Sequence, residues 1–179
     1  MRATGKYYVL NIVISVVTVA AFALVAGTFD RYTPDWPPFI YFFLNGAGYG
    51  GLLTVTLLAL IASADHEQQA VITSASYAFR STGATIGITL ASAVFQNLLK
   101  NQLWSRFSDR RDAAEVIAKL RDSVDYIKHL PPGWYDGVMD SYMSAFRGVW
   151  VLNLGLAVLG ALIGLGMREH VLHKTLERR

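Results

Sequence analysis

The sequence predicts an all-α integral membrane protein in which four helices cross the bilayer. The 179 residues are 53% hydrophobic and only 16% charged, with a mean hydropathy of +0.35. The charges are also segregated, because four runs contain none: 7–29, 36–64, 81–99 and 148–167. Each run is about as long as the roughly 20 helical residues that cross a hydrocarbon core. We therefore expect spans at about 7–29, 36–64, 70–99 and 143–167.

The first span follows a short basic segment with Arg2 and Lys6, as a cleavable signal peptide would. Its charge-free stretch, 7–29, is longer than the roughly 7 to 15 apolar residues of a signal peptide, and no clear small-residue cleavage site lies near its end. We interpret it as a membrane helix that ends before the turn "DRYTPDWPP".

The second span contains the words "NGAGYGG", in which Gly46, Gly48 and Gly51 spell G-x-G-x-x-G and Asp65 follows. This fingerprint marks a dinucleotide site only where it follows a strand and opens a helix. Here it lies inside a long charge-free run, which is too apolar for such a unit. The glycines therefore indicate a membrane helix, and we expect neither an enzyme nor a cofactor.

The third span alternates small and hydroxyl residues with apolar ones, a composition that lets membrane helices approach closely. We expect it to be buried among neighbouring helices. Arg80 is the one ionisable residue that could lie within a span, which makes it a candidate for a substrate cavity. The alternative is a position at the membrane boundary, because the 19 residues after it cover about 28 Å as a helix.

Between the third and fourth spans lies the polar segment 100–142, with an amphipathic helix expected at about 112–130. Asp112 and Glu115 resemble a capping box at its start, and Pro131-Pro132 ends it. The expected apolar face consists of Ala113, Val116, Ile117, Leu120, Val124 and Ile127.

The distribution of basic residues suggests an orientation. An even number of spans puts both ends of the chain on one side, where Arg2, Lys6, Arg168 and the tail lie close to the membrane. The positive-inside rule then predicts that both ends are cytosolic and that the segment 100–142 faces outward or into an organelle.

Three spans carry the small-xxx-small pattern of close helix packing, and the pairs are Gly46 with Gly50, Gly83 with Gly87, and Gly160 with Gly164. Helix packing is the expected role. A bend in the second span beside a binding cavity is the alternative.

Asn45, Tyr49, Tyr77 and Arg80 are the candidates for a substrate cavity, although hydrogen bonds between helices would also explain the polar ones. No metal site is expected. The chain has no cysteine, and "HEQQA" lacks the second histidine of a zincin motif. The eight basic residues between Lys100 and Arg147 are interleaved with acids, so no nucleic-acid partner is expected.

Several stretches of the sequence, and the order in which they occur, resemble the C-terminal part of fungal major facilitator transporters. The similar stretches are "GAGYGGLLTVTLLALIASADHEQQAVITSASYAFRSTGATIG", the later "DYIKHLPPG" and "TGKYYVLN". The closest group is the fourteen-helix drug:proton antiporters with their vacuolar basic amino acid relatives.

The resemblance implies that the four spans are the last four helices of the C-terminal bundle. It also implies proton-coupled alternating access, with the lipid bilayer, a small solute and protons as partners, in the plasma or vacuolar membrane. The N-terminal bundle is missing from this chain, so we expect the chain alone to be inactive unless other membrane chains complete it. The alternative is a stand-alone four-span protein that oligomerises through its glycine faces.

Overall fold

The computed structural model describes residues 8–34, 36–64 and 66–166, and within them every regular element is helical. Four helices are long and apolar enough to cross a membrane: α1 (Tyr8–Thr28), α2 (Trp36–Ala62), α3 (Gln69–Phe107) and α5 (Tyr135–Leu165). The predicted fold class, an all-α membrane protein with four long apolar helices, is confirmed.

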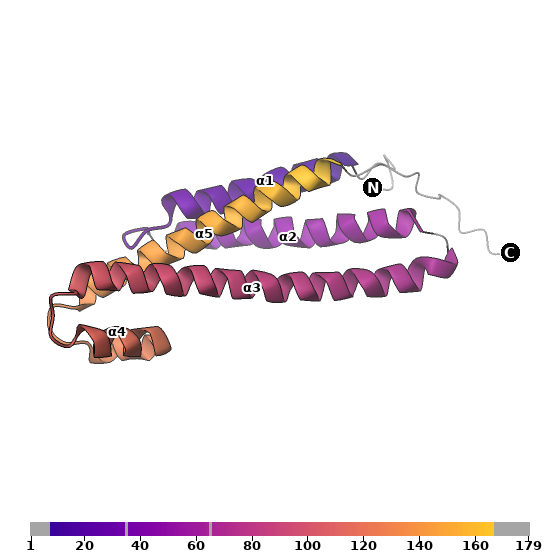
Figure 1. Cartoon of the computed structure of the whole chain (residues 1–179). Helices are drawn as coiled ribbons and strands as arrows, with labels where there is room; N and C mark the ends of the chain where they lie inside the picture. The colour runs from indigo at the N-terminus through magenta and orange to yellow at the C-terminus, as the bar shows by residue number, and fades with distance from the viewer. Residues whose placement is uncertain (1–7, 35, 65, 167–179) are drawn as a thin grey trace.

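The four long helices run antiparallel in chain order (Figure 1). The start of α1, the end of α5 and the α2–α3 turn lie at one end of the molecule, while the α1–α2 loop and α4 lie at the other. A short 3₁₀ turn, η1 (His66–Gln68), precedes α3. α1 packs on both α2 and α5, and α5 packs on α3, so the contact order is α2, α1, α5, α3. α2 and α3 follow each other in sequence but touch much less.

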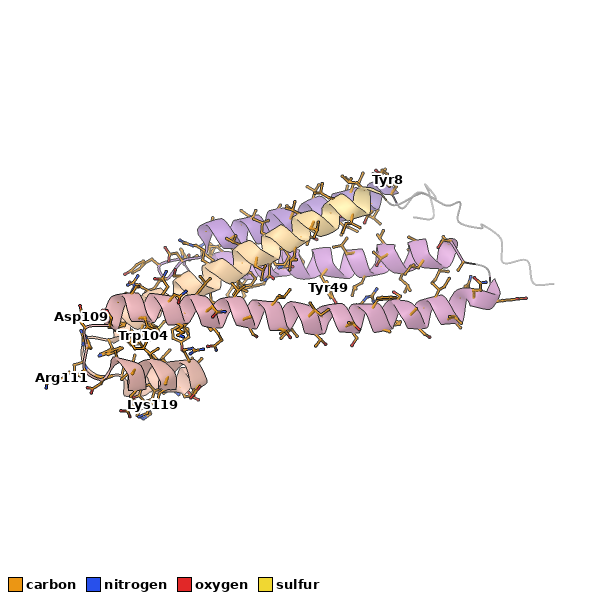
Figure 2. All side chains as sticks on the ribbon, in the orientation of Figure 1. Tyr8, Tyr49, Trp104, Asp109, Arg111 and Lys119 are labelled. Carbon is orange, nitrogen blue, oxygen red and sulfur yellow. The ribbon has the colours of Figure 1, made fainter. Side chains whose placement is uncertain are left out.

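A compact cap covers the far end of α3 and α5. It contains α4 (Ala113–Asp122) and the 3₁₀ helix η2 (Val124–His129), packed on the last turns of α3 and the first turns of α5. Its buried side chains form one apolar cluster: Leu99, Leu103, Phe107, Ala113, Val116, Ile117, Leu120, Trp134, Val138, Tyr142 and Ala145. Charged residues such as Asp109, Arg111 and Lys119 lie on its surface (Figure 2).

Two contacts fix the cap internally. The rings of Phe107 and Trp134 stack with centroids 4.1 Å apart, and the guanidinium of Arg110 lies over both. The buried hydroxyl of Tyr142 donates a hydrogen bond to the carbonyl of Leu120 at 2.7 Å, which satisfies an acceptor at the end of α4.

The amphipathic helix is shorter than the sequence predicts. α4 ends at Asp122, Ser123 is extended, and η2 follows, so 112–130 is not one helix. The hydroxyl of Ser123 accepts the amide N–H of Asp125 at 3.3 Å, a local bond that competes with continued helix. Val124 is consequently 65% exposed instead of buried, whereas Ile127 packs partly against the cluster.

The predicted capping box is also wrong, because the Asp112 side chain makes no capping hydrogen bond. Glu115 instead accepts a hydrogen bond from Lys119 at 2.6 Å, one helical turn further on. This pairing lowers the pKa of Glu115.

The third span differs from expectation in length and in burial. α3 continues to Phe107, well past the predicted end at Leu99, and its last turns build the cap. Its membrane portion is largely uncovered within the described residues, with Phe79 79% and Ile88 70% exposed. The predicted burial among neighbours is not met in this chain, because the membrane portion of α3 packs mainly on α5, touches α2 much less and is otherwise open.

A charge cluster ties the α1–α2 loop to the first turns of α5 and the last turn of α3. Arg31 donates to Asp136 at 2.6 Å and to Asp140 at 3.3 Å, and Arg106 on α3 also contacts Asp140 at 3.3 Å. The hydrogen bond with Asp136 raises the pKa of Arg31. Asp30 and Arg147 form a looser pair at 3.7 Å.

Candidate functional site

A cavity of about 520 Å³ lies where α1, α2 and α5 meet. Three features make it the candidate site: it is formed by three of the long apolar helices, its walls are mostly apolar, and a few polar side chains line it. The lining residues are Ser15, Thr18, Phe22, Tyr49, Leu52, Leu53, Thr56, Asn153, Leu156, Ala157, Gly160 and Ala161.

Two glycines of α2 bring it close to α1 beside this cavity. A Cβ atom at Gly48 would fall on the Thr18 side chain, and one at Gly51 would lie 2.7 Å from the Ile14 Cδ1 atom. Gly48 therefore requires glycine for the observed distance between the helices, whereas a Cβ at Gly51 would require the Ile14 side chain to move. Thr18 and Gly48 are buried by this contact.

Two of the four hydroxyl groups that line the cavity are already hydrogen-bonded to their own helix. Thr18 donates to the carbonyl of Ile14 at 2.9 Å, and Thr56 donates to that of Leu52 at 2.7 Å. Within the described residues, the Ser15 and Tyr49 hydroxyls and the Asn153 side-chain amide make no hydrogen bond. An amide offers two donors and an acceptor, so Asn153 is the most versatile free polar group in the cavity.

An aromatic cluster borders the cavity on the side of the cap. Phe22 lines the cavity and lies 6.4 Å from Trp150, whose ring is also 5.8 Å from Phe42. The indole N–H of Trp150 is buried and has no acceptor within the described residues. The cluster thus joins α1, α2 and α5 by apolar contact.

The four predicted cavity residues do not converge. Tyr49 lines the cavity and lies midway along α2 (Figure 2). Asn45 is one turn earlier on α2, half-buried and outside the lining. Tyr77 and Arg80 lie on α3, where the Arg80 guanidinium is 5.4 Å from the centroid of the Tyr77 ring. A cavity role for Asn45, Tyr77 and Arg80 stays a prediction.

Asn153 was missed by the sequence reasoning, although a signal was present. It is the single amide in the charge-free run 148–167, and polar side chains inside membrane helices commonly bond across helices or to a ligand. Asn11 is likewise a side-chain amide inside a charge-free run, that of the first span. Its amide donates to the carbonyl of Gly164 at 3.1 Å, which joins α1 to α5.

A second cavity, of about 390 Å³, lies in the groove between α1 and α5. Its walls are aliphatic apart from Asn11 and Ser15, and the Asn11 amide is already bonded to α5. Because it offers little polar contact, this groove suits an acyl chain or a neighbouring helix better than a polar solute.

The glycine fingerprint lies inside α2, which is one continuous helix with neither the strand that a dinucleotide site requires nor the break considered for a binding cavity. The predicted packing glycines overlap only at Gly164 with the glycines that lie against another helix in the described residues. Nothing lies within 4 Å of a Cβ placed at Gly46, Gly50, Gly83, Gly87 or Gly160, and Gly164 alone of the predicted six meets another helix, at Asn11. Packing of the other five against segments outside this chain stays a prediction.

Within the described residues no three metal-ligating side chains gather. The basic residues of both ends, on which the orientation rests, lie outside the described residues.

Comparison with known proteins identifies fungal membrane transporters. The chain is 34% identical over 183 aligned residues to the multidrug resistance protein fnx1 of Schizosaccharomyces pombe, covering 99% of this chain and 34% of that protein. It is 27% identical over 156 residues to the vacuolar basic amino acid transporter 1 of Saccharomyces cerevisiae, covering 81% of this chain and 28% of that one. The MFS-type efflux transporter ffsH of Aspergillus flavipes is 26% identical over 177 residues, or 97% of this chain and 31% of the relative.

No family profile and no solved structure matches the chain. The chain spans about one third of the length of the curated relatives it matches. By homology over nearly its whole length, this chain belongs to the fungal major facilitator transporters and corresponds to a part of a full-length member.

Proposed function

We propose that this chain forms part of a proton-coupled transporter that moves a small organic solute across a fungal membrane by alternating access. The observation that carries the proposal is homology to transporters along nearly the entire chain. The cavity between α1, α2 and α5 supports it, because sites between membrane helices are where transporters hold their solutes.

The solute of the parent is a drug-like molecule or a basic amino acid, since relatives are named for multidrug resistance and for vacuolar transport of basic amino acids. The corresponding membrane is the plasma membrane or the vacuolar membrane. Both ends of the chain face the cytosol in this proposal, and the cap faces outward or into the vacuole.

The chain alone is inactive in this proposal. Its relatives are about three times longer, and alternating access needs a second bundle that rocks against the first. The uncovered faces of α3, with Gly83 and Gly87 open, are where the missing helices would pack.

The test is transport by the full-length polypeptide that carries this segment, reconstituted in vesicles with an imposed proton gradient. We expect gradient-driven flux of a drug or of a basic amino acid, abolished by a protonophore. Arg80→Ala should reduce the flux at least tenfold, while Arg111→Ala, an exposed substitution in the cap, should leave it unchanged. Absence of gradient-driven flux for both solute classes would overturn the proposal.

The alternative, a stand-alone four-span protein that oligomerises, makes a different prediction for the 179-residue chain. Crosslinking in native membranes should then trap stable homo-oligomers through cysteines introduced at Gly83 or Gly87. Rapidly degraded monomer would reject the alternative.

A further inference from the structure

We propose that one uncovered face of α3 binds a transmembrane helix from the part of the full-length transporter that lies outside this chain. The docking face is a set of exposed, short side chains: Ala78, Thr82, Thr85, Thr89 and Ser92. The helix that binds there carries a carboxylate at the end nearest the cap, beside Lys100 and Arg121. The inference rests on the proposed function, in which this chain works within a longer transporter, and it names the face of α3 that a missing helix covers.

The first argument is continuity with an interface that the structure contains. Leu99, Leu103 and Phe107 of α3 lie in the apolar cluster with α4. Away from the cap, the docking face continues the same alternating spacing of three and four residues, through Gln96. Residues at this spacing share one side of a helix. α4 runs beside only the last turns of α3 (Figure 1), so it covers one end of this side and leaves the rest open.

Two hydrogen bonds fix the place where α4 ends. The Gln96 side-chain N–H donates to the Arg121 carbonyl at 3.4 Å, and the Arg121 Nε donates to the Gln96 side-chain oxygen at 3.2 Å. α4 ends at the next residue, Asp122. A second helix can therefore pack on α3 directly beyond this point, in line with α4.

The chemistry of the docking face suits a helix. Each of its threonines donates to a backbone carbonyl of α3, at 2.9 to 3.1 Å, so these hydroxyls need no outside partner. Short side chains let the backbones of two membrane helices approach closely. The adjacent side of α3 differs, because Phe79, Ile86 and Leu90 present large, exposed apolar groups. Those groups suit lipid chains, whereas the docking face suits close packing.

Charge indicates which kind of helix binds. Lys100 lies one turn beyond Gln96 on the same side of α3, and Arg121 is bonded to Gln96, so both cations flank the end of the docking face nearest the cap. Both are exposed, and neither forms an ion pair within the described residues. A carboxylate on the incoming helix would lie within reach of both cations, and such charge-assisted pairs favour one partner and one register.

The occupant is a segment of the same polypeptide and not a second copy of this chain. The chain covers 34% of the multidrug resistance protein fnx1, so about two thirds of a full-length polypeptide lies outside it. A segment of the same polypeptide is held near the docking face at a high effective concentration, which a separate copy is not.

The experiment uses the full-length polypeptide in lipid nanodiscs, with a photoreactive diazirine amino acid in place of Thr85 or of Ser92. Crosslinked peptides are identified by mass spectrometry. We expect both positions to label one helix outside this segment, with the Ser92 adduct nearer the end of that helix that lies beside the cap. Ala78 provides a third position on the same face should either variant fail to fold, as judged by size-exclusion chromatography.

Leu90 is the matched control, because it lies at the depth of Thr89 and about 100° around α3 from it. A diazirine there points to a different side and should label the same helix about fivefold less. Adducts only with lipid, or only with peptides of this 179-residue segment, as a second copy would give, would overturn the docking face. Equal labelling of that helix from Leu90 would do the same.

The carboxylate is tested separately by melting of the full-length protein. Arg121→Glu should melt at a lower temperature than Arg111→Glu, the same charge reversal elsewhere on the exposed surface of the cap. Replacing the acid of the labelled helix by lysine should restore the melting temperature of Arg121→Glu and not that of Arg111→Glu, because only residues in contact are coupled.

Melting is measured both in maltoside micelles, whose detergent has no phosphate, and in phospholipid nanodiscs. Equal melting temperatures of the two variants in both media would overturn the carboxylate. A difference confined to nanodiscs would assign the two cations to lipid phosphates and would also overturn it.

These outcomes are separable from failure of the proposed function, because labelling requires no transport. Gradient-driven flux without labelling of an outside helix would reject the docking face and leave transport intact. Labelling of such a helix without flux of any solute would support the docking face and reject the transport proposal.

Discussion

Replacing Gly48 by alanine tests whether this glycine sets the distance between α1 and α2. The added Cβ would fall on the Thr18 side chain and lie 3.3 Å from the Thr18 Cα and Cβ atoms. Thr18 lies on a packed helix face and is hydrogen-bonded to its own backbone, so relief requires the helices to separate. Overpacking of this kind costs about 1 to 3 kcal/mol.

Gly46→Ala is the matched control, two residues earlier on the same helix with nothing within 4 Å of its Cβ. Both variants gain the same helix propensity of up to about 1 kcal/mol, so their difference isolates the packing effect. We would measure unfolding in mixed micelles against the mole fraction of dodecyl sulfate, by far-ultraviolet circular dichroism. Gly48→Ala should be less stable than Gly46→Ala by about 1 to 3 kcal/mol.

Thr18→Ala provides an internal check, because it removes the hydroxyl that the new Cβ would meet. Adding it to Gly48→Ala should recover a measurable part of the lost stability, a coupling expected only between residues in contact. Equal stability of the two alanine variants, or no coupling to Thr18, would show that Gly48 is not the point of closest approach.

Four further predictions concern the cap. Trp134→Ala removes a ring that is 2% exposed and should destabilise the cap by about 3 to 5 kcal/mol, seen as faster hydrogen exchange of α4 amides while α1 amides keep their rates. Tyr142→Phe leaves the Leu120 carbonyl without its donor and should cost about 1 kcal/mol in the same assay. Burial raises the pKa of Tyr142. The neutral phenol therefore contributes its full stability below the unfolded pKa of about 10, and this contribution is lost as the pH rises through the higher folded pKa. Chemical denaturation at pH 9 and pH 11 should show the loss of stability, and Tyr142→Phe should abolish this pH dependence. Lys119 lowers the pKa of Glu115, so the pair stabilises α4 above the unfolded pKa of about 4.5 and loses this effect as pH falls through the lower folded value; a pH titration of α4 helicity that is identical in Lys119→Gln would contradict the pairing.

The four long helices follow from charge segregation alone, because a charge-free run of about 20 residues has few stable alternatives in a bilayer. Charge segregation does not predict which face of a helix packs on its neighbour. The words "GAGYGG" contain the pair Gly46 and Gly50 and the pair Gly48 and Gly51, each one turn apart and on different sides of one helix. The partner helix selects between the pairs, and it selects Gly48 and Gly51.

Only one polar residue of the candidate site was predicted from the sequence, for a similar reason. Tyr49 was named from its residue type inside a span, and it lines the cavity. Asn153 was not, since an amide in an apolar run can bond its neighbours, a ligand or a helix outside the chain with equal ease. The end of α4 was set by Ser123, whose local hydrogen bond outweighs an apolar period that continues through Ile127.

The contact between α1 and α5 has a consequence for the order of synthesis. Asn11 and Gly164 are 153 residues apart in the chain, and among the described residues the Asn11 amide donates to a carbonyl of α5. At roughly 5 to 20 residues per second, about 8 to 30 seconds of translation separate the two. α1 is therefore made well before its partner, and the bond between α1 and α5 forms only after α5 has been synthesised.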